Sequence, residues 1–289
     1  MDATARIERA IERSLDRATV KSAPPRLSDA MRYAVLPGGA RVRPHLCLAV
    51  AAACGASQVG VTDSMAAAIE FLHCASLIHD DLPCFDDAEM RRGKRSVHAA
   101  FGEPIAVLAG DALIVLAFET LAHEAVGAPA RLEAMIMTLA QATGMPSGIA
   151  AGQAWEGEPS VPLSQYHRQK TGALFVAATV GGALSAGAHP DPWVRLGACI
   201  GEAYQVADDI KDLVCDATMM GKPCGQDLIN ARPSAMRDLG LQGAVARLEA
   251  LLDEAVRSIP PCRGKSELKS IILAQAKRLV PKDLGTVAA

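Results

Sequence analysis

Apolar residues recur at the spacing of an amphipathic α-helix along almost the whole chain, and alternating β-branched runs are nearly absent. Aromatic residues make up only 3% of the sequence, which also disfavours a β-sandwich. Half of the residues are hydrophobic, so a chain of 289 residues can bury one sizeable core. Short loops such as SAPP, LPGG, RRGKRS and IPPCRG separate the periodic segments, and no long linker divides them. The sequence therefore predicts an all-α fold in which residues 1–289 form a single domain.

The periodic segments and the turn signals between them set the expected helices. These are residues 3–19, 27–36, 44–54, 62–81, 103–126, 129–143, 146–155, 163–186, 190–215, 234–257 and 264–279. The segment 62–81 begins at Thr62, which is typical of an N-cap, and it ends in acidic residues.

Two clusters of aspartates each follow an apolar helical stretch, where an unneutralised carboxylate is costly. The segment IHDDLPCFDD contains Asp80, Asp81 and Asp86, and the segment YQVADDIKD contains Asp208, Asp209 and Asp212. A helix carries negative charge poorly at its C-terminal end, where the first cluster lies. Carboxylate oxygens are natural ligands of Mg²⁺, which shares its remaining positions with water and substrate phosphates. Two such clusters facing each other predict a magnesium cage for a diphosphate.

Basic side chains lie close to both clusters and to glycines. They are Arg41 and Arg43 beside Gly38 and Gly39 in LPGGARVRP, Arg91 and Arg92 in MRRGKRS, Lys170 and Thr171 in HRQKTGALF, and Lys222 in GKPCGQD. Each group alone is typical of a solvated surface, but together they supply the cations that a diphosphate requires beyond magnesium. His73 precedes Asp80 by seven residues and shares its helical face; a lone histidine there also fits a packed core.

Charge and cysteine content exclude several other classes. The net charge of −3 gives no global attraction to nucleic acid or to anionic membranes. The eight cysteines show no CxxC or Cys/His metal spacing, and Cys47, Cys74 and Cys199 lie in apolar runs typical of a reduced core. The N-terminal segment is charged and amphipathic, and no uncharged run reaches the length of a membrane span. We expect a cytoplasmic protein without stable membrane insertion.

These motifs, in this order, resemble those of the trans-isoprenyl diphosphate synthases, and most closely the bacterial geranylgeranyl diphosphate synthases of carotenoid pathways. The resemblance runs from GGARVRP through HCASLIHDDLPCFDDAEMRRG, GDAL, KTGALF and YQVADDIKD to GKPCGQDL. It implies an all-α bundle around a deep central cavity, a homodimer, and Mg²⁺-dependent joining of isopentenyl diphosphate to an allylic diphosphate. Three Mg²⁺ ions are expected when substrate is bound.

The resemblance also implies a role for each motif residue. Asp80 and Asp86, with Asp81 in support, resemble the magnesium ligands for the allylic diphosphate, and Asp208, with Asp209 and Asp212, resembles the opposing magnesium site. Arg91 resembles the arginine that binds the allylic diphosphate. Gly39, Arg43, His73 and Arg92 resemble the isopentenyl diphosphate pocket. Lys170, Thr171, Gln205 and Lys222 resemble the groups around the allylic cation and its leaving diphosphate.

The chain departs from the family pattern at one position that bears on binding. The family pattern GGKRxRP has a lysine where this chain has Ala40, and Arg41 is the residue we expect to compensate. Two smaller departures are Tyr204, where phenylalanine is usual, and the segment NARPS, where GKxT is typical. Two rival interpretations remain at this point. A class I terpene cyclase would carry a different second metal motif, and a non-catalytic subunit of a heteromeric synthase would lose metal aspartates.

The helix that carries the first cluster also resembles the family's gauge of product length. In related short-product enzymes a bulky aromatic residue lies four or five positions before the first aspartate, whereas Ser76 and Ala75 stand here. The next bulky side chains are Leu72 and Phe71, one turn or about 6 Å further along the helix. We therefore expect a twenty-carbon product, with farnesyl diphosphate, the fifteen-carbon product, as the alternative.

Overall fold

The computed structural model describes residues 2–124, 128–160, 162–214 and 235–279, with side chains from 2 to 211 and from 239 to 275 apart from those gaps. The longer helices are α1 (Ala3–Ala18), α2 (Pro25–Val35), α3 (Val42–Ala53), α4 (Val59–Asp80), α6 (Glu103–Glu124), α7 (Pro129–Thr143), α10 (Ala173–Ser185), α11 (Val194–Val214), α14 (Ala235–Arg257) and α15 (Lys265–Leu279). Shorter elements are α5 (Val97–Phe101), α8 (Ile149–Ala154), α9 (Leu163–His167), the 3₁₀ turns η2 (Trp155–Gly157) and η4 (Asp191–Trp193), the π-helical turn η3 (Arg168–Gly172), and the strands β1 (Met90–Arg91) and β2 (Lys94–Arg95). The predicted all-α fold is confirmed.

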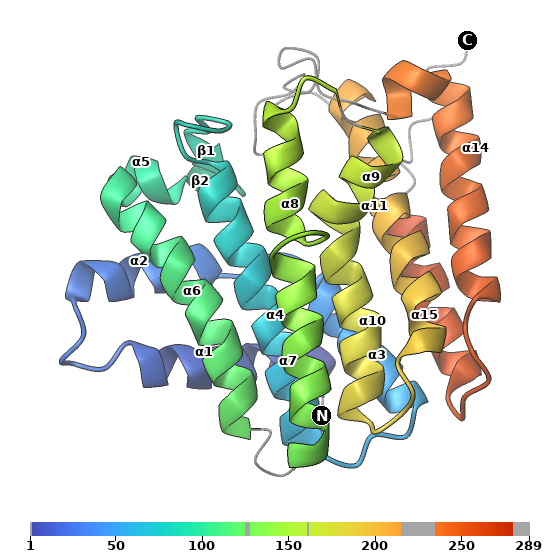
Figure 1. The fold of residues 1–289 in the computed structure, drawn as a ribbon, viewed down its shortest axis with the longest axis horizontal. Helices are drawn as coiled ribbons and strands as arrows, with labels where there is room; N and C mark the ends of the chain where they lie inside the picture. Colours follow the sequence, from blue (N-terminus) through green and yellow to red (C-terminus); the bar gives the residue numbers. More distant parts are fainter. Residues whose placement is uncertain (1, 125–127, 161, 215–234, 280–289) are drawn as a thin grey trace.

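The bundle is organised around α4, which packs against α3, α6 and α10. Figure 1 shows α6, α7, α10 and α11 arranged in a row, with α8 above α7, with α1 and α2 crossing one end of the row, and with α14 covering α11 at the other. Helix α10 packs against α3, α7 and α11. This arrangement leaves the C-terminal ends of α4 and α11 at the same end of the bundle.

Two of the helices are long and apolar enough to cross a membrane by length and composition. In α4 the apolar window is 83% buried inside the protein, as in the core helix of a globular fold. The corresponding window of α6 is only 44% buried. The burial of α4 explains its sequence, because a helix surrounded on all sides by other helices needs apolar residues on every face.

The start of α4 differs from the prediction that Thr62 is its N-cap. The helix begins three residues earlier, after Gln58, and Thr62 lies inside its first turn. The Thr62 hydroxyl is 3.0 Å from the Ser185 hydroxyl in the buried contact between α4 and α10. The hydroxyl therefore serves a contact between helices, which a local capping signal cannot reveal.

Two further local structures differ from the expected helices and loops. The expected helix at residues 163–186 is divided into α9, η3 and α10, because five residues adopt π-helical geometry. The segment RRGKRS, expected as a loop, forms an antiparallel hairpin of β1 and β2. Its turn is Arg92–Gly93, and both residues have positive φ, as a tight hairpin turn requires. Both differences fall on segments that carry candidate site residues.

Candidate active site

A cavity of about 890 Å³ opens at the C-terminal end of α4 and extends down into the bundle. Its mouth is lined by the acidic side chains Asp80, Asp86 and Asp208. Its deeper wall is lined by apolar groups that include Leu72, Ala75, Ile114 and Ile149. The cavity therefore combines a charged mouth with an apolar interior.

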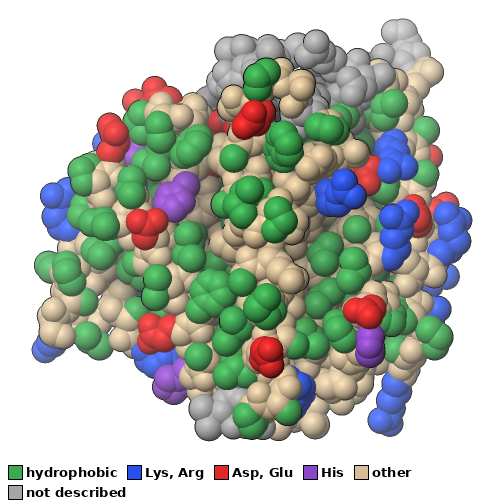
Figure 2. All heavy atoms as spheres, viewed as in Figure 1, with side chains coloured by type: hydrophobic (Ala, Val, Ile, Leu, Met, Phe, Trp, Pro, Cys, Tyr) green, Lys and Arg blue, Asp and Glu red, His purple; other side chains and the backbone are tan. Residues whose placement is uncertain are grey.

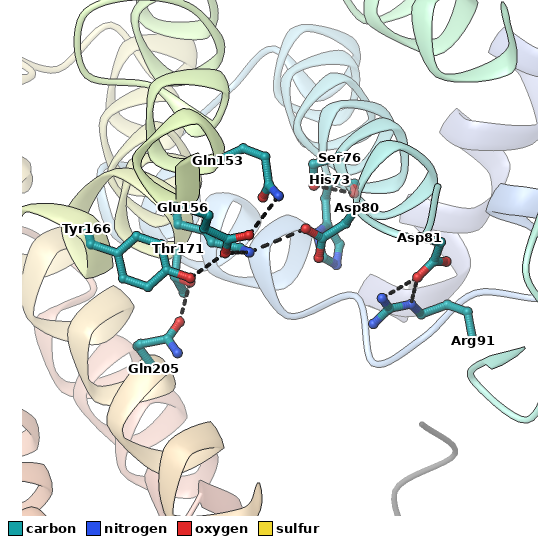
Figure 3. A network of polar contacts seen from close by, with 11 residues as sticks. His73, Ser76, Asp80, Asp81, Arg91, Gln153, Glu156, Tyr166, Thr171 and Gln205 are labelled. Carbon is teal, nitrogen blue, oxygen red and sulfur yellow. Dashed lines mark hydrogen bonds and ion pairs between the residues drawn. The ribbon is translucent and has the colours of Figure 1, made fainter. Parts of the chain in front are cut away.

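Three carboxylates gather at one point of the mouth. Asp80, Asp86 and Glu156 each place a carboxylate oxygen within 4.8 Å of the others, and all three are half-buried. The Lys170 ammonium lies between two of them: it is 3.3 Å from Asp80 Oδ1 and also pairs with Glu156 (Figure 3). The donor set suits Mg²⁺, a hard cation that takes oxygen ligands.

Sequence reasoning missed Glu156 because the local pattern ends a helix at residue 155 and begins a loop there. In the structure Glu156 lies in η2, directly after α8, and its carboxylate is held in place by neighbouring side chains. The Tyr166 hydroxyl donates to Glu156 Oε1 at 2.5 Å, and Gln153 Nε2 donates to Oε2 at 3.0 Å. An acidic residue at the end of an apolar helix was the available signal, and it is the same signal that identified Asp80.

The π-helical turn η3 explains how Lys170 and Thr171, adjacent in sequence, both line the cavity. The turn packs tightly on α8 at Gly152, where an added Cβ would lie 2.3 Å from the backbone nitrogen of Lys170. Only glycine permits this approach of two backbones. Because π geometry changes the angle between successive side chains, the two residues point to the mouth together, and such turns are frequent at functional sites.

The second aspartate cluster divides between two environments. Asp208 is exposed and lines the cavity, whereas Asp209 is 3% exposed and is not among its lining residues. Asp209 Oδ1 accepts a hydrogen bond of 2.9 Å from Gln205 Nε2. The Gln205 carbonyl oxygen in turn accepts from the Thr171 hydroxyl at 2.5 Å (Figure 3). Asp209 thus fixes the orientation of the Gln205 amide.

A similar division holds in the first cluster. Asp81 is 2% exposed and accepts from Arg91 Nε at 2.9 Å, in an ion pair that anchors the hairpin of β1 and β2 to α4 (Figure 3). Burial raises the pKa of Asp81, although the Arg91 guanidinium favours the charged form. Arg91 itself also lines the cavity. Asp81 therefore positions Arg91 at the mouth.

The expected isopentenyl diphosphate residues come together beside the aspartates. Arg43 and His73 line the cavity, and Arg92 Nη2 lies 3.3 Å from His73 Nε2. The Arg43 guanidinium stacks 4.5 Å above the ring of Phe175. An added Cβ on Gly39 would lie 3.0 Å from Arg92 Cζ, so the glycine turn directly adjoins this basic group.

Charge and burial set the protonation of this basic group. Burial, together with the neighbouring charges of Arg43 and Arg92, holds the pKa of His73 well below 6.5. His73 is therefore neutral near pH 7, and its Nε2 accepts from Arg92, because a guanidinium can only donate. Arg43 Nε is buried without a hydrogen-bond partner among the described residues.

The expectation that Arg41 supplies the cation missing at Ala40 is wrong for direct contact with an anion in the cavity. Arg41 is only 3% exposed, and its guanidinium is bound by Glu8 and Glu70 below the glycine turn. It cannot extend into the cavity while it holds these partners. The guanidinium group that adjoins Gly39 is that of Arg92, and Arg43 is the arginine of this motif that lines the cavity.

Of the four residues expected to gauge product length, three line the cavity. These are Leu72, Ala75 and Ser76. Phe71 is fully buried and is not among the lining residues, so its inclusion as a floor residue is wrong. Successive residues of a helix point in directions about 100° apart, and Phe71 faces the core instead. The expected residues Lys222 and the side chain of Asp212 lie outside the described residues.

A mouth rich in carboxylates and arginines above an apolar interior suits a molecule with a diphosphate head and a hydrocarbon tail. The fold and the cavity thus define the class of helical-bundle proteins that handle isoprenoid diphosphates. The polyprenyl synthetase family model matches residues 24–270, and the chain belongs to this family.

Relatives agree with this assignment over nearly the full length. The chain is 53% identical over 280 residues to a geranylgeranyl diphosphate synthase of Cereibacter sphaeroides, covering 97% of each chain. It is 48% identical over 275 residues to the geranylgeranyl diphosphate synthase of Rhodobacter capsulatus, covering 95% of each. Among solved structures, a Helicobacter pylori geranyltransferase complexed with magnesium and isoprenyl diphosphate has a TM-score of 0.80 at 29% identity, covering 96% of this chain and 98% of that one.

Proposed function

We propose that this chain is a geranylgeranyl diphosphate synthase. It joins isopentenyl diphosphate to an allylic diphosphate (dimethylallyl, geranyl or farnesyl diphosphate) and releases diphosphate. The observation that carries the proposal is a cavity with three carboxylates at its mouth and small side chains, Ala75 and Ser76, on its inner wall. The bacterial relatives named as geranylgeranyl diphosphate synthases support the same substrate class.

Asp80, Asp86 and Glu156 would hold Mg²⁺ on one side of the mouth, and Asp208 would hold it on the other. We propose three ions in the substrate complex. When bound, Mg²⁺ would neutralise charge on the diphosphate leaving group as the allylic carbon–oxygen bond breaks. The oxygen-rich set of half-buried carboxylates fits this ion better than softer metals.

The basic side chains at the mouth bind the leaving group from the remaining directions. Arg91, held by Asp81, and Lys170, held by Glu156, each present fixed positive charge to the cavity. Donors fixed before the reaction stabilise developing charge without reorganisation. The Thr171 and Gln205 pair lies beside them, with oxygen atoms that can stabilise positive charge on the allylic carbon.

The group formed by Gly39, Arg43, His73 and Arg92 would bind the diphosphate of isopentenyl diphosphate. Neutral His73 shares a hydrogen bond with Arg92 and leaves the arginine charge uncompensated. Two arginines can each bind phosphate oxygens through paired N–H groups. This places the second substrate next to the first, on the same face of α4.

The bond changes follow from this placement. The allylic carbon–oxygen bond breaks and its electron pair leaves with diphosphate. The double bond of isopentenyl diphosphate then supplies the electrons for the new carbon–carbon bond. The departing diphosphate takes the proton that is lost, which restores a double bond. The apolar wall formed by Leu72, Ala75 and Ile114 keeps water from the allylic cation.

The direct test is to incubate the purified protein with Mg²⁺, labelled isopentenyl diphosphate and each allylic diphosphate in turn. We expect geranylgeranyl diphosphate as the main product. Farnesyl diphosphate would leave the chemistry intact and correct the product length. Cyclised hydrocarbon would indicate a terpene cyclase, and the absence of any condensation would indicate a non-catalytic subunit, which the presence of both aspartate clusters disfavours.

Replacing Glu156 by glutamine is expected to raise the Mg²⁺ concentration needed for half-maximal activity by about tenfold. The substitution removes one of the three carboxylates while nearly retaining its shape. The glutamine carbonyl oxygen can still accept from the Tyr166 hydroxyl, whereas its amide nitrogen cannot accept the hydrogen bond that Gln153 donates. The measurement is initial rate against Mg²⁺ concentration. Glu158→Gln is the matched control, because Glu158 is exposed two residues further along. An unchanged Mg²⁺ dependence in Glu156→Gln would remove Glu156 from the metal site.

We also propose that the chain is a homodimer that forms through the outer face of α6 and α7. Figure 2 shows hydrophobic side chains gathered over these helices. The exposed residues include Leu108, Val115 and Met137, with Val115 65% exposed. An apolar face this large is typical of an interface, and its length along two helices suits a second copy of the same face. A cytoplasmic location is part of the same proposal.

Replacing Val115 by glutamate is expected to convert the dimer into a monomer at micromolar concentration, because two charges would meet near the proposed symmetry axis. Light scattering coupled to size-exclusion chromatography measures the mass. Val20→Glu is the control, because Val20 is similarly exposed but lies in the turn after α1. A wild-type chain that elutes as a monomer would refute the dimer.

A further inference from the structure

Arg41 is a buried arginine that does not line the cavity and has no role in the reaction proposed above. It lies at the turn before α3 with φ 48° and ψ 36°, the left-handed region that non-glycine residues rarely adopt. Its side chain is 1% exposed. The structure therefore keeps a strained backbone and a buried charge two residues before Arg43, which does line the cavity.

Three helices supply the partners of the Arg41 guanidinium. Nε donates to Glu8 of α1 at 2.8 Å, and Nη2 donates to the second oxygen of Glu8 at 3.2 Å. Nη1 donates to Glu70 of α4 at 2.8 Å, and Nη2 also donates to the Val35 carbonyl at the end of α2 at 2.9 Å. These bonds tie α1, α2 and α4 to the start of α3.

The glycine turn lies directly against this guanidinium. A Cβ added to Gly38 would lie 2.1 Å from Arg41 Cζ, so the turn follows the surface of the arginine side chain. The next residue, Gly39, adjoins Arg92. The turn is thus enclosed between two guanidinium groups, and the position of its backbone N–H groups depends on where Arg41 is held.

Glu70 connects this arrangement to the cavity. It is 2% exposed and lies one helical turn before His73 on α4. Burial lowers the pKa of Arg43, and the nearby charges of Glu70 and Asp208 oppose that effect. Burial also disfavours the charged form of Arg41, but its bonds to Glu8 and Glu70 raise its pKa above the ordinary value. One buried carboxylate therefore supports both arginines.

We propose that Arg41 is a positioning residue for the isopentenyl diphosphate pocket. Held by Glu8 and Glu70, it fixes the Gly38–Gly39 turn against Arg92, and the fixed turn presents its backbone N–H groups to the diphosphate. This inference rests on the proposed function. It also explains how a pocket with Ala40 in place of a lysine can bind its anion, because Arg41 holds the glycine turn in position next to Arg92.

The test uses Glu8→Ala and Arg41→Lys in the full chain. Glu8 is 31% exposed, so its loss leaves the core packed, and lysine keeps the charge of Arg41 but not its set of donors. We expect the KM for isopentenyl diphosphate to rise about tenfold in each variant, with the KM for the allylic diphosphate and kcat changing less than about twofold. Isothermal titration with isopentenyl diphosphate should show the same loss of affinity without turnover.

Asp63→Ala is the matched control. Asp63 forms the other ion pair between α1 and α4, with Arg6 Nη2 2.6 Å from its Oδ1, and it does not touch the glycine turn. We expect it to lower the melting temperature at least as much as Glu8→Ala while leaving both KM values unchanged.

Several outcomes would overturn the proposal. One is an equal rise of the KM for isopentenyl diphosphate and the KM for the allylic diphosphate in Glu8→Ala and Arg41→Lys. Another is a rise of the KM for isopentenyl diphosphate in the Asp63→Ala control. Either result would mark a merely structural role for Arg41. An unchanged affinity for isopentenyl diphosphate in the titrations of Glu8→Ala and Arg41→Lys would also overturn the proposal. If the wild-type protein binds isopentenyl diphosphate but performs no condensation, the proposed function fails while the titration still decides the role of Arg41.

Discussion

Asp80→Asn is expected to lower kcat by at least about a thousandfold, equivalent to about 4 kcal/mol of transition-state stabilisation. Asp80 contributes one of the three carboxylates that come within 4.8 Å of one another, and asparagine is a far weaker ligand for Mg²⁺. The KM for isopentenyl diphosphate should change little, because its proposed pocket around His73 and Arg92 lies elsewhere on the mouth. Steady-state kinetics at saturating Mg²⁺ measures both quantities.

Folding should not account for this loss. Asp80 stands at the C-terminal end of α4, where the helix dipole disfavours a negative charge, and near two other carboxylates. Its neutralisation removes this repulsion but also the 3.3 Å ion pair with Lys170, so the melting temperature of the metal-free protein should change little. Asp111→Asn is the control, because Asp111 lines the same cavity, is exposed, and lies 3.6 Å from His79. Equal losses in the two variants would attribute the effect to the general charge of the mouth.

Ala75→Phe is expected to change the main product from twenty to fifteen carbons. Ala75 lies on the cavity wall five residues before Asp80, about 7.5 Å along the helix axis, where a growing tail must pass. A phenyl ring at this position occupies the space that the last isoprene unit needs. Chromatography of the dephosphorylated products from labelled isopentenyl diphosphate measures the distribution.

Phe71→Leu controls for disturbance of α4. Phe71 is on the same helix, one turn away, but it is fully buried and does not line the cavity. This variant should lose stability, as large-to-smaller core substitutions do, and keep the wild-type product. A product profile that is unchanged in Ala75→Phe would refute the gauge on α4 and place the floor on α6 or α8.

The helices and the aspartate clusters could be predicted because their signals are local. The 3.6-residue period of apolar residues is visible within each segment, and carboxylates at the end of such a segment stand out against it. Asp80 and Asp208 were found in this way, and both line the cavity. Glu156 carries the same signal more weakly, because it precedes a turn and no second acid stands beside it.

The remaining assignments depend on which way neighbouring side chains point in the folded chain. Asp208 and Asp209 are adjacent in sequence, yet one lines the cavity and the other is buried against Gln205. Arg41 and Arg43 lie in one motif, yet only Arg43 reaches the cavity. The charge of each residue can be read from the sequence, but the helix that buries its side chain in the fold cannot.

The π turn was unpredictable for a related reason. Its sequence, RQKTG, is compatible with a regular helix, and the departure lies where α8 approaches closely at Gly152, a contact between distant segments. The hairpin turn at Arg92–Gly93 did carry a local signal, an arginine before glycine between short polar runs. That pattern is common in loops, so it did not distinguish a hairpin.

The continuity of α4 has a consequence for how enzymes of this design can diverge. Glu70, His73, Ala75 and Asp80 stand on one unbroken helix, spaced over about 15 Å. In the proposed site, the separation between the two diphosphate positions and the tail wall is therefore fixed by helix geometry and cannot be altered by loop length. If that site is correct, selection for a longer or shorter product acts on side-chain volume at single positions of this helix. Such changes leave the rest of the bundle intact, so one scaffold can serve a series of chain lengths.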